Sequence, residues 1–202
     1  MPANPPLPIE CSALLVIDVQ DSFRADPARW SRRSNPDFEA NISRLVSAYR
    51  TAGQPVIFFL HTDSDPGFER DSPHLRLMAF LEPREDEPVL LKGTRNCFTS
   101  TDLERRLTER GVRRLAVTGI QTEQCCETTA RVAADLGYDV DFVMEATRTF
   151  PIRHADPAVQ DGLPVADILR RTDFVLRGRF ARIATVDALA RELEGAMASS
   201  AG

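Results

Sequence analysis

Three side chains able to carry out nucleophilic chemistry lie where buried strands are expected to end. Asp18 and Lys92 come at the ends of two apolar runs, and Cys125 follows a third. A thiol attacks carbonyl carbon, a carboxylate accepts and returns the proton, and an ammonium group balances the charge of both. The carboxyl ends of parallel strands share one edge of a sheet, and ligands bind there. We therefore expect the three side chains to meet at one site.

Cys125 and Cys126 are adjacent, and position distinguishes them. Cys125 lies in the first turn of an expected helix, where unpaired backbone N–H groups and the helix dipole favour a thiolate and can hold an oxyanion. Cys126 lies about 100° further round that helix, so we expect it to point into the core. Taken singly, Asp18, Lys92 and Cys125 also have structural interpretations: a helix cap, a solvated strand end and a small buried side chain. Their shared place at one sheet edge favours function.

The order of apolar runs predicts an α/β protein. Continuous apolar stretches bounded by turn residues are typical of strands buried on both faces. The expected strands are 13–19, 55–60, 89–92, 114–120, 139–144 and 181–185. Five helices are expected. The first starts at Asn35-Pro36 and ends at Gly53, and the second runs from a capping box at Thr101–Glu104 to Gly111. The other three cover 123–136, 164–178 and 186–197. This alternation predicts a three-layer αβα sandwich with a parallel sheet.

The length and composition fit one soluble domain. All 202 residues are assigned to it, with a Pro-rich arm at 1–10 and a flexible tail at 197–202. The net charge of −5 argues against nucleic-acid and membrane partners. No apolar run is long enough to span a bilayer and the N-terminus has no basic signal region, so we expect a cytoplasmic protein. The four cysteines are expected to be free thiols.

Three stretches resemble the isochorismatase-like cysteine hydrolases. They are "ALLVIDVQDSF" (13–23), "LLKGTRNCF" (90–98) and "VTGIQTEQCCETTARVAADLGYDV" (117–140). The resemblance extends from about residue 10 to 195. It implies a catalytic triad of Asp18, Lys92 and Cys125 and a six-stranded parallel sheet of order 3-2-1-4-5-6. In that order the first and fourth strands flank the point where the strand order reverses, which agrees with the expected position of the site.

The resemblance also implies a mechanism without a cofactor. A non-proline cis peptide bond is expected between Ile120 and Gln121, and the backbone N–H groups of Gln121 and Cys125 would form the oxyanion hole. Cys125 would attack a carbonyl carbon, and Asp18 would pass the proton to the leaving amine and then activate water. Lys92 would hold both groups in charge balance.

The number and order of the histidines argue against the nicotinamidase branch of the family. Members of that branch bind a metal through an Asp-x-His pair after the second strand and through further histidines. Here His61 precedes Asp63, and only His74 and His154 remain. A metal site is therefore not expected.

Substrate preference is weakly encoded. The candidate pocket residues are Phe23, His61, Asn96, Phe98, Thr122 and Phe150. Trp30 is interpreted as core packing or a subunit contact. An arginine near the pocket would suit a carboxylate-bearing substrate, but too many are present for the sequence to choose among them. They include Arg24, Arg29, Arg32, Arg33, Arg95 and Arg148.

Three functions remain open at this point. The leading hypothesis is a cysteine hydrolase that cleaves an amide, carbamoyl or ureido C–N bond of a small molecule. The second is a vinyl ether hydrolase of the isochorismatase type, which shares Asp18 but needs no thiol chemistry. The third is a non-catalytic binding protein that retains the fold. A homodimer or homotetramer is expected from the resemblance and from apolar residues in the long loops.

Overall fold

The computed structural model describes residues 7–156, 158–159 and 161–200. Most of the expected Pro-rich arm lies outside these residues. At the other end, the last helix, α6 (Val186–Ser200), continues through four of the residues that were expected to form a flexible tail. None of the described helices is long and apolar enough to cross a membrane.

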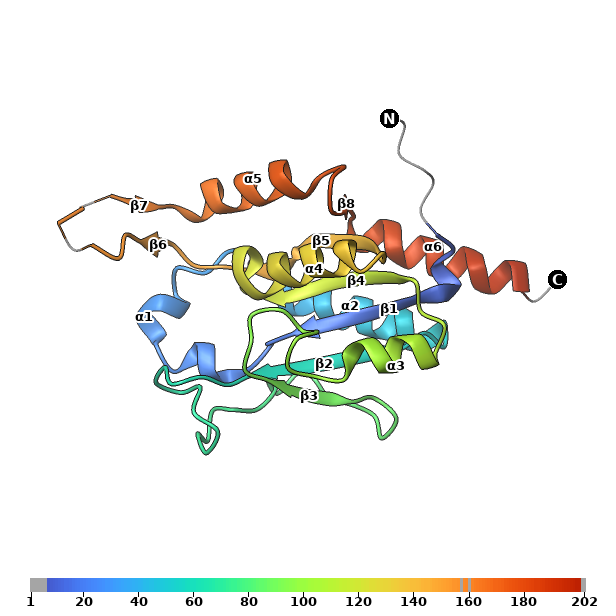
Figure 1. Ribbon diagram of the computed structural model, residues 1–202, viewed down its shortest axis with the longest axis horizontal. Coiled ribbons are helices and arrows are strands. Elements are labelled where there is room, and N and C mark those ends of the chain that lie inside the picture. The colour runs from blue at the N-terminus through green and yellow to red at the C-terminus, as the bar shows by residue number, and fades with distance from the viewer. Residues whose placement is uncertain (1–6, 157, 160, 201–202) are drawn as a thin grey trace.

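A six-stranded parallel sheet forms the centre of the molecule (Figure 1). Its strands are β1 (Ser12–Ile17), β2 (Val56–His61), β3 (Val89–Lys92), β4 (Arg114–Ile120), β5 (Asp139–Arg148) and β8 (Arg182–Ile183). Their order is β3-β2-β1-β4-β5-β8, which confirms the predicted order. Every residue of β1 and β4 is buried, as the continuous apolar runs indicated.

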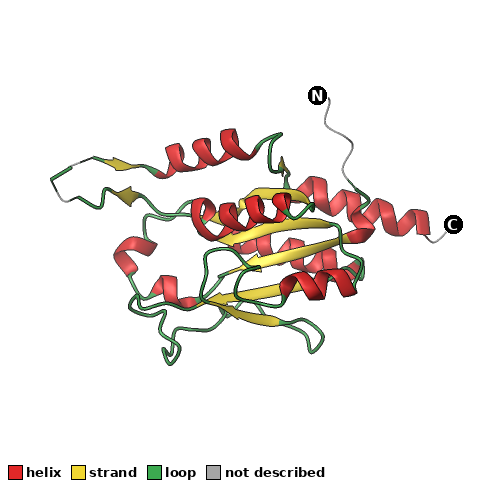
Figure 2. Cartoon of the chain, viewed as in Figure 1, coloured by secondary structure: helices red, strands yellow, loops and turns green. Residues whose placement is uncertain are grey.

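Helices cover both faces of this sheet, as Figures 1 and 2 show. Helix α2 (Phe38–Thr51) and α6 cover one face, while α3 (Leu103–Glu109), α4 (Glu127–Asp135) and α5 (Val165–Leu176) lie on the other. Helix α2 buries side chains spaced three or four residues apart, including Phe38, Ile42 and Leu45, which is the pattern of a helix packed on a core. The predicted three-layer arrangement is confirmed.

The remaining elements lie at the carboxyl edge of the sheet. They are a 3₁₀ turn (Asp21–Arg24), α1 (Pro27–Trp30), a π-helical turn (Thr122–Cys126) and the antiparallel strands β6 (Ile152–Arg153) and β7 (Gly162–Leu163). The sequence did not predict β6 and β7, because neither two-residue strand lies in an apolar run. A further 3₁₀ turn, Ile9–Cys11, precedes β1.

Two helix starts differ from the prediction. The expected capping box at Thr101 is absent: the Thr101 hydroxyl accepts the Leu103 N–H at 3.1 Å and donates to the Cys97 carbonyl at 2.6 Å. Helix α2 starts at Phe38, because Asn35 takes a positive φ of 49° and its side-chain amide donates to the Met144 carbonyl at 2.9 Å. At Thr101 other local hydrogen bonds replace the capping box, whereas at Asn35 a contact with a distant part of the chain replaces the predicted helix start.

Gly119 lets β4 pass close to β1 near the carboxyl edge of the sheet. Its φ is 124°, and a Cβ atom at this position would lie 1.9 Å from the Ile17 carbonyl oxygen. The register between β4 and β5 shifts at the same point, between Val117 and Gly119. Only glycine fits, and it carries the chain into the segment that holds Cys125.

Candidate active site

The structure brings Asp18, Lys92 and Cys125 together at the carboxyl edge of the sheet. The Lys92 ammonium lies 2.8 Å from the Asp18 carboxylate oxygen Oδ2 and 3.5 Å from the Cys125 Sγ. It also donates to the Thr94 carbonyl at 3.2 Å. The three side chains are buried, with relative exposures of 0% for Asp18, 1% for Lys92 and 4% for Cys125. They come from the ends of three strands that are far apart in sequence.

The backbone around Asp18 is specialised to hold its carboxylate. Asp18 takes a φ of 53°, which is uncommon for a residue other than glycine and recurs at functional sites. Its N–H donates to the Phe59 carbonyl at 3.0 Å, which anchors the turn to β2. One carboxylate oxygen, Oδ2, accepts from Lys92, while Oδ1 is buried without a hydrogen-bond partner in the described part of the chain. Oδ1 is thus an available proton acceptor.

Charge and burial set the resting state of the pair Lys92 and Cys125. Burial lowers the pKa of Lys92, but the nearby charges of Asp18 and Cys125 outweigh it and raise that pKa above its usual value. Burial and the charge of Asp18 raise the pKa of Cys125, and Lys92 offsets this only in part. Cys125 therefore rests as a thiol. The expectation that the start of the helix would favour a thiolate is wrong, because desolvation and the adjacent carboxylate dominate.

The other two buried cysteines near Lys92 differ from Cys125. Cys126 is fully buried in the core between the sheet and its helices, as predicted, and burial raises its pKa well above the usual value. The Cys97 Sγ accepts a hydrogen bond from the Thr129 hydroxyl at 3.4 Å, and burial raises its pKa to about 12. Cys125 is the cysteine whose sulfur accepts a hydrogen bond from Lys92.

The segment between β4 and Cys125 contains the cis peptide bond that the resemblance implied, Ile120–Gln121. The Gln121 carbonyl accepts from the N–H groups of Gln124 and Cys126 at 3.2 Å, which closes the π-helical turn. Thr122 was a pocket candidate, but it is fully buried and its hydroxyl donates to the Thr147 hydroxyl at 2.9 Å. Thr122 thus joins this turn to β5.

His61 adjoins the three residues and is held in a neutral form. Its Nδ1 lies 3.3 Å from the Lys92 ammonium, and its Nε2 lies 3.0 Å from the Asp63 carboxylate. Burial, and then the charge of Lys92, lower the pKa of His61. The side-chain amide of Gln20, which no sequence motif singled out, holds the His61 backbone by accepting its N–H at 2.7 Å and donating to its carbonyl at 3.0 Å.

His61 and Asp63 are hydrogen-bonded to each other rather than arranged around an ion. The described residues contain no group of three or more His, Cys, Asp or Glu side chains placed to hold a metal. His74 is exposed, in the loop between β2 and β3.

Aromatic side chains form a wall beside the site. The Phe23 ring lies 5.0 Å from that of Phe68, edge to face, and stacks on Phe150 at 5.9 Å. The Phe68 ring in turn lies 6.2 Å from the His61 ring. Phe68 was missed because it lies in a long polar loop; its signal was a single aromatic residue within "DPGFER". Trp30 packs beside Phe150 at 6.1 Å and against the core, which agrees with its interpretation as a packing residue.

Comparison with known proteins shows the family of this chain. Residues 12–166 match the model of the isochorismatase domain. The chain belongs to the isochorismatase family. It is 30% identical to the isochorismatase family protein YrdC of Bacillus subtilis, over 89% of this chain and 95% of YrdC. It is 35% identical to a streptothricin hydrolase of Streptomyces noursei, over 81% of this chain and 64% of that protein.

Solved structures agree with this assignment. A hydrolase of the isochorismatase family from Chromobacterium violaceum superimposes with a TM-score of 0.84 at 27% identity, over 96% of this chain and all of that one. A cysteine hydrolase from Pseudomonas syringae shares the fold, with a TM-score of 0.85 at 24% identity and coverage of 97% of this chain and all of that one. We conclude that the protein is an isochorismatase-family hydrolase.

Two other pocket candidates lie outside the aromatic wall. Phe98 belongs to the core cluster that also contains Cys125, whereas Phe23 belongs to the other cluster, and the Phe98 ring lies 5.9 Å from that of Tyr138. The Asn96 side-chain oxygen accepts the N–H groups of Phe98 and Thr99, both at 2.9 Å, and so shapes its own loop. The structure does not bring these side chains into the wall formed by Phe23, Phe68 and Phe150.

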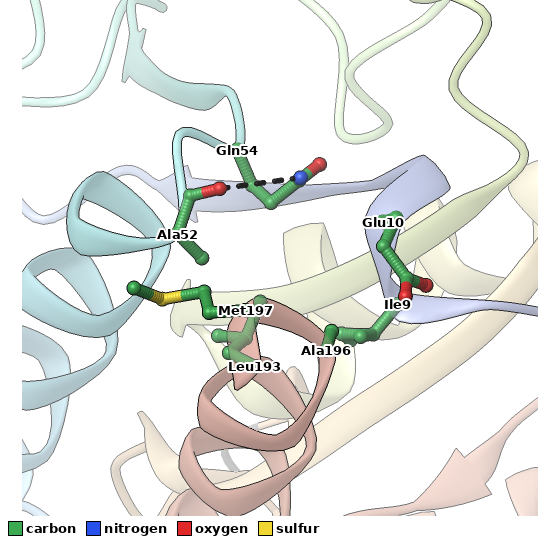
Figure 3. A pocket seen from close by; sticks show the side chains of 7 residues that line it. All are labelled: Ile9, Glu10, Ala52, Gln54, Leu193, Ala196 and Met197. Carbon is green, nitrogen blue, oxygen red and sulfur yellow. Dashed lines mark hydrogen bonds between the residues drawn. The ribbon is translucent and has the colours of Figure 1, made fainter. Parts of the chain in front are cut away.

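A separate cavity of about 510 Å³ lies at the amino ends of β1 and β2 (Figure 3). Its lining residues are Ile9, Glu10, Ala52, Gln54, Leu193, Ala196 and Met197. These residues come before β1, before β2 and from α6, whereas the triad follows the carboxyl ends of the strands. The cavity is therefore not part of the site around Cys125.

Proposed function

We propose that this hydrolase cleaves a C–N bond of a small amide, carbamoyl or ureido compound through a covalent thioester. The observation that carries the proposal is the buried contact of Lys92 with both Asp18 and Cys125, at 2.8 and 3.5 Å. A thiol, a free carboxylate oxygen and a fixed positive charge are the groups that acyl transfer requires. Some relatives carry names of the same kind: a ureidoacrylate amidohydrolase of Variovorax paradoxus is 29% identical and a nicotinamidase of Arabidopsis thaliana is 32% identical.

The first half of the reaction forms the thioester. The Cys125 thiol gives its proton to Oδ1 of Asp18 as the sulfur attacks the carbonyl carbon. The carbonyl oxygen becomes an oxyanion, which the backbone N–H groups of Gln121 and Cys125 stabilise. The proton on Asp18 then moves to the amine nitrogen as the C–N bond breaks. The amine leaves, and the acyl group stays on Cys125.

The second half restores the enzyme. Asp18, again a carboxylate, takes a proton from a water molecule, and the resulting hydroxide attacks the thioester carbon. The C–S bond breaks, the acid product leaves, and the proton on Asp18 returns to the sulfur. Lys92 stays positively charged throughout, so the buried site never holds an uncompensated negative charge. The wall of Phe23, Phe68 and Phe150 limits the access of bulk water.

The test replaces each adjacent cysteine in turn. The Cys125→Ala variant should lose at least about 10³-fold in kcat on any small amide that the wild type hydrolyses, because nucleophilic catalysis is removed. The matched Cys126→Ala variant removes a core sulfur one residue away and should retain its kcat within a few-fold. Ammonia release from a panel of small amides measures both. Turnover that survives in Cys125→Ala contradicts the proposal.

Adding isochorismate to this panel separates the other two functions. Hydrolysis of isochorismate by Cys125→Ala would identify a vinyl ether hydrolase that uses Asp18 without the thiol. An unreactive Cys125 together with no turnover of any compound would indicate a binding protein.

A further inference from the structure

The arginines near the site differ in what their side chains bind. Arg24 pairs with Glu39 at 2.8 Å, and Arg95 pairs with Asp63 at 3.3 Å. Arg148 is buried and donates to the Asn35 carbonyl at 3.0 Å.

Arg32 and Arg33, which follow α1, also have acceptors. Arg32 donates to the Ala28 carbonyl at 3.3 Å, and Arg33 donates to the Trp30 carbonyl at 2.9 Å. Among the described residues, no hydrogen bond or ion pair joins the Arg29 guanidinium to any side chain or carbonyl. The structure therefore separates Arg29 from the five other arginines, which the sequence could not do.

Arg29 lies on the aromatic wall that leads to the triad. Its guanidinium carbon is 4.6 Å from the centre of the Phe150 ring and 6.0 Å from that of Phe23. Phe23 contacts Phe68, and Phe68 contacts His61, which adjoins Lys92. A guanidinium stacked on an aromatic face keeps the N–H groups at its edge free to bind in their own plane.

The surroundings of Arg29 favour one added negative charge. The side chain is half-buried, and burial lowers its pKa while the charges of Asp26, Glu123 and Asp65 raise it. In the described part of the chain no ion pair joins Arg29 to any of these carboxylates; Glu123 Oε2 accepts from the Thr149 hydroxyl at 2.5 Å, and the Asp26 carboxylate accepts the backbone N–H of Arg29. A half-buried guanidinium without a partner gains most from a planar anion that takes two of its N–H groups. The nearby carboxylates would repel a dianion, which favours a carboxylate over a phosphate.

We propose that Arg29 is the substrate anchor of this enzyme, and that the substrate is a small amide bearing a free carboxylate away from the scissile bond. This inference rests on the proposed amide hydrolysis at Cys125 and extends it to the class of compound. The carboxylate binds the edge of the Arg29 guanidinium while the amide carbonyl reaches Cys125. Arg29 takes no part in bond breaking.

Matched pairs of amides test this inference. Succinamic acid and glutaramic acid each carry a carboxylate where butyramide and valeramide end in a methyl group. Wild-type kcat/KM, measured by ammonia release, should be about 10- to 100-fold higher for the acids than for the neutral partners, as expected of one charge-assisted contact. Arg29→Gln should remove this preference, mainly through KM, and leave the neutral amides within a few-fold of wild type.

Two further variants show whether the preference for the acids depends on the position of the guanidinium and on its two-point binding of a carboxylate. Arg32→Gln removes a guanidinium three residues away whose partner is the Ala28 carbonyl, and it should keep the full preference for the acids. Arg29→Lys keeps the charge but loses two-point binding, so it should restore only part of the preference.

Binding to the Cys125→Ala variant, measured by calorimetry, separates this inference from the proposed reaction. The Cys125→Ala variant should bind the acids more tightly than the neutral amides, and Cys125→Ala/Arg29→Gln should not. This result supports the anchor even if the wild type hydrolyses none of the four compounds. Such an absence of turnover would contradict amide hydrolysis and not the anchor. Equal affinities and equal kcat/KM values for acids and neutral amides overturn the anchor while leaving amide hydrolysis intact. Absence of both binding and turnover for all four overturns both.

Discussion

The two oxygens of Asp18 have different surroundings, and this difference defines the chemistry at the residue scale. Oδ2 accepts from Lys92 at 2.8 Å, whereas Oδ1 is buried without a partner among the described residues. A carboxylate held on one side and free on the other can receive a proton without moving. Because the pKa of Cys125 is raised by burial and by Asp18, attack and proton transfer must be coupled.

This arrangement predicts opposite pH shifts for two charge-removing substitutions. Asp18→Asn removes the negative charge that raises the pKa of Cys125, so the pH midpoint of Cys125 alkylation by iodoacetamide should fall. Lys92→Gln removes the positive charge that lowers this pKa, so the midpoint should rise. Both variants should lose about 10²- to 10⁴-fold in turnover, because Asp18 supplies the proton acceptor and Lys92 holds it.

Alkylation rates at Cys125, read by mass spectrometry across a pH series, measure these midpoints. Circular dichroism checks that each variant is folded, since both substitutions leave one buried charge without its partner. Midpoints that move in the same direction in the two variants would contradict the assigned charges.

At the scale of elements, the site depends on where strands end and how their connections turn. The positive φ of Asp18 ends β1, the glycine at 119 allows β4 to approach β1, and the π-helical turn places Cys125 ahead of α4. At the opposite edge, Asp141 accepts from Arg114 and Arg182, both at 2.6 Å, and these arginines also bind Glu192. This partly buried network joins β4, β5 and β8 to α6, and so adds ion pairs to the backbone pairing of the short strand β8 with β5.

Substitution of Gly119 tests the close approach of β4 to β1. A Cβ atom in Gly119→Ala would lie 1.9 Å from the Ile17 carbonyl oxygen, and the backbone has a φ of 124°. We expect a loss of about 3 kcal/mol or more in the free energy of unfolding, measured by urea denaturation.

Gly53→Ala is the matched control. Gly53 also has a positive φ, of 67°, but no atom lies within 4 Å of its added Cβ. The cost there should be about 1–2 kcal/mol, from the backbone conformation alone. Equal losses in the two variants would show that the contact with Ile17 is unimportant.

At the scale of the whole molecule, the topology places the site where the strand order reverses. Strands β1 and β4 are neighbours at the centre of the sheet, and the chain leaves them toward opposite edges. Asp18 and Cys125 follow these two strands, which is where open α/β sheets bind ligands. The isochorismatase-family fold and the position of the site are therefore consequences of the same strand order.

A homodimer or homotetramer remains our prediction for the assembled protein. Large apolar side chains are exposed on the segment of β7 and α5, including Phe174 at 69% and Leu163 at 54%. Such side chains commonly lie in subunit contacts. Light scattering coupled to size-exclusion chromatography should give two or four times the chain mass of 22.5 kDa. A monomeric mass over a wide range of protein concentration would contradict this prediction.

The sequence by itself determined the positions of most strands and helices, the layered α/β class and the residues expected to meet at the sheet edge, whereas the strand order came from the resemblance to the isochorismatase-like family. It could do so because buried strands are continuous apolar runs, and because Asp18, Lys92 and Cys125 each lie next to the end of one. The short strands β6 and β7 and the helix start at Phe38 were not predicted, since distant contacts rather than local propensity decide them.

Only the tertiary structure decided what each side chain near the site does. Asn96, Phe98 and Thr122 were equal candidates with Phe23 and Phe150 in sequence. In the structure Asn96 shapes its own loop, Thr122 is bonded to β5, and Phe98 packs in the core cluster that contains Cys125. Burial beside a carboxylate, which no local pattern encodes, keeps Cys125 a thiol. The partner of each arginine likewise depends on residues far along the chain, and for this reason Arg29 became distinct only once the chain was folded.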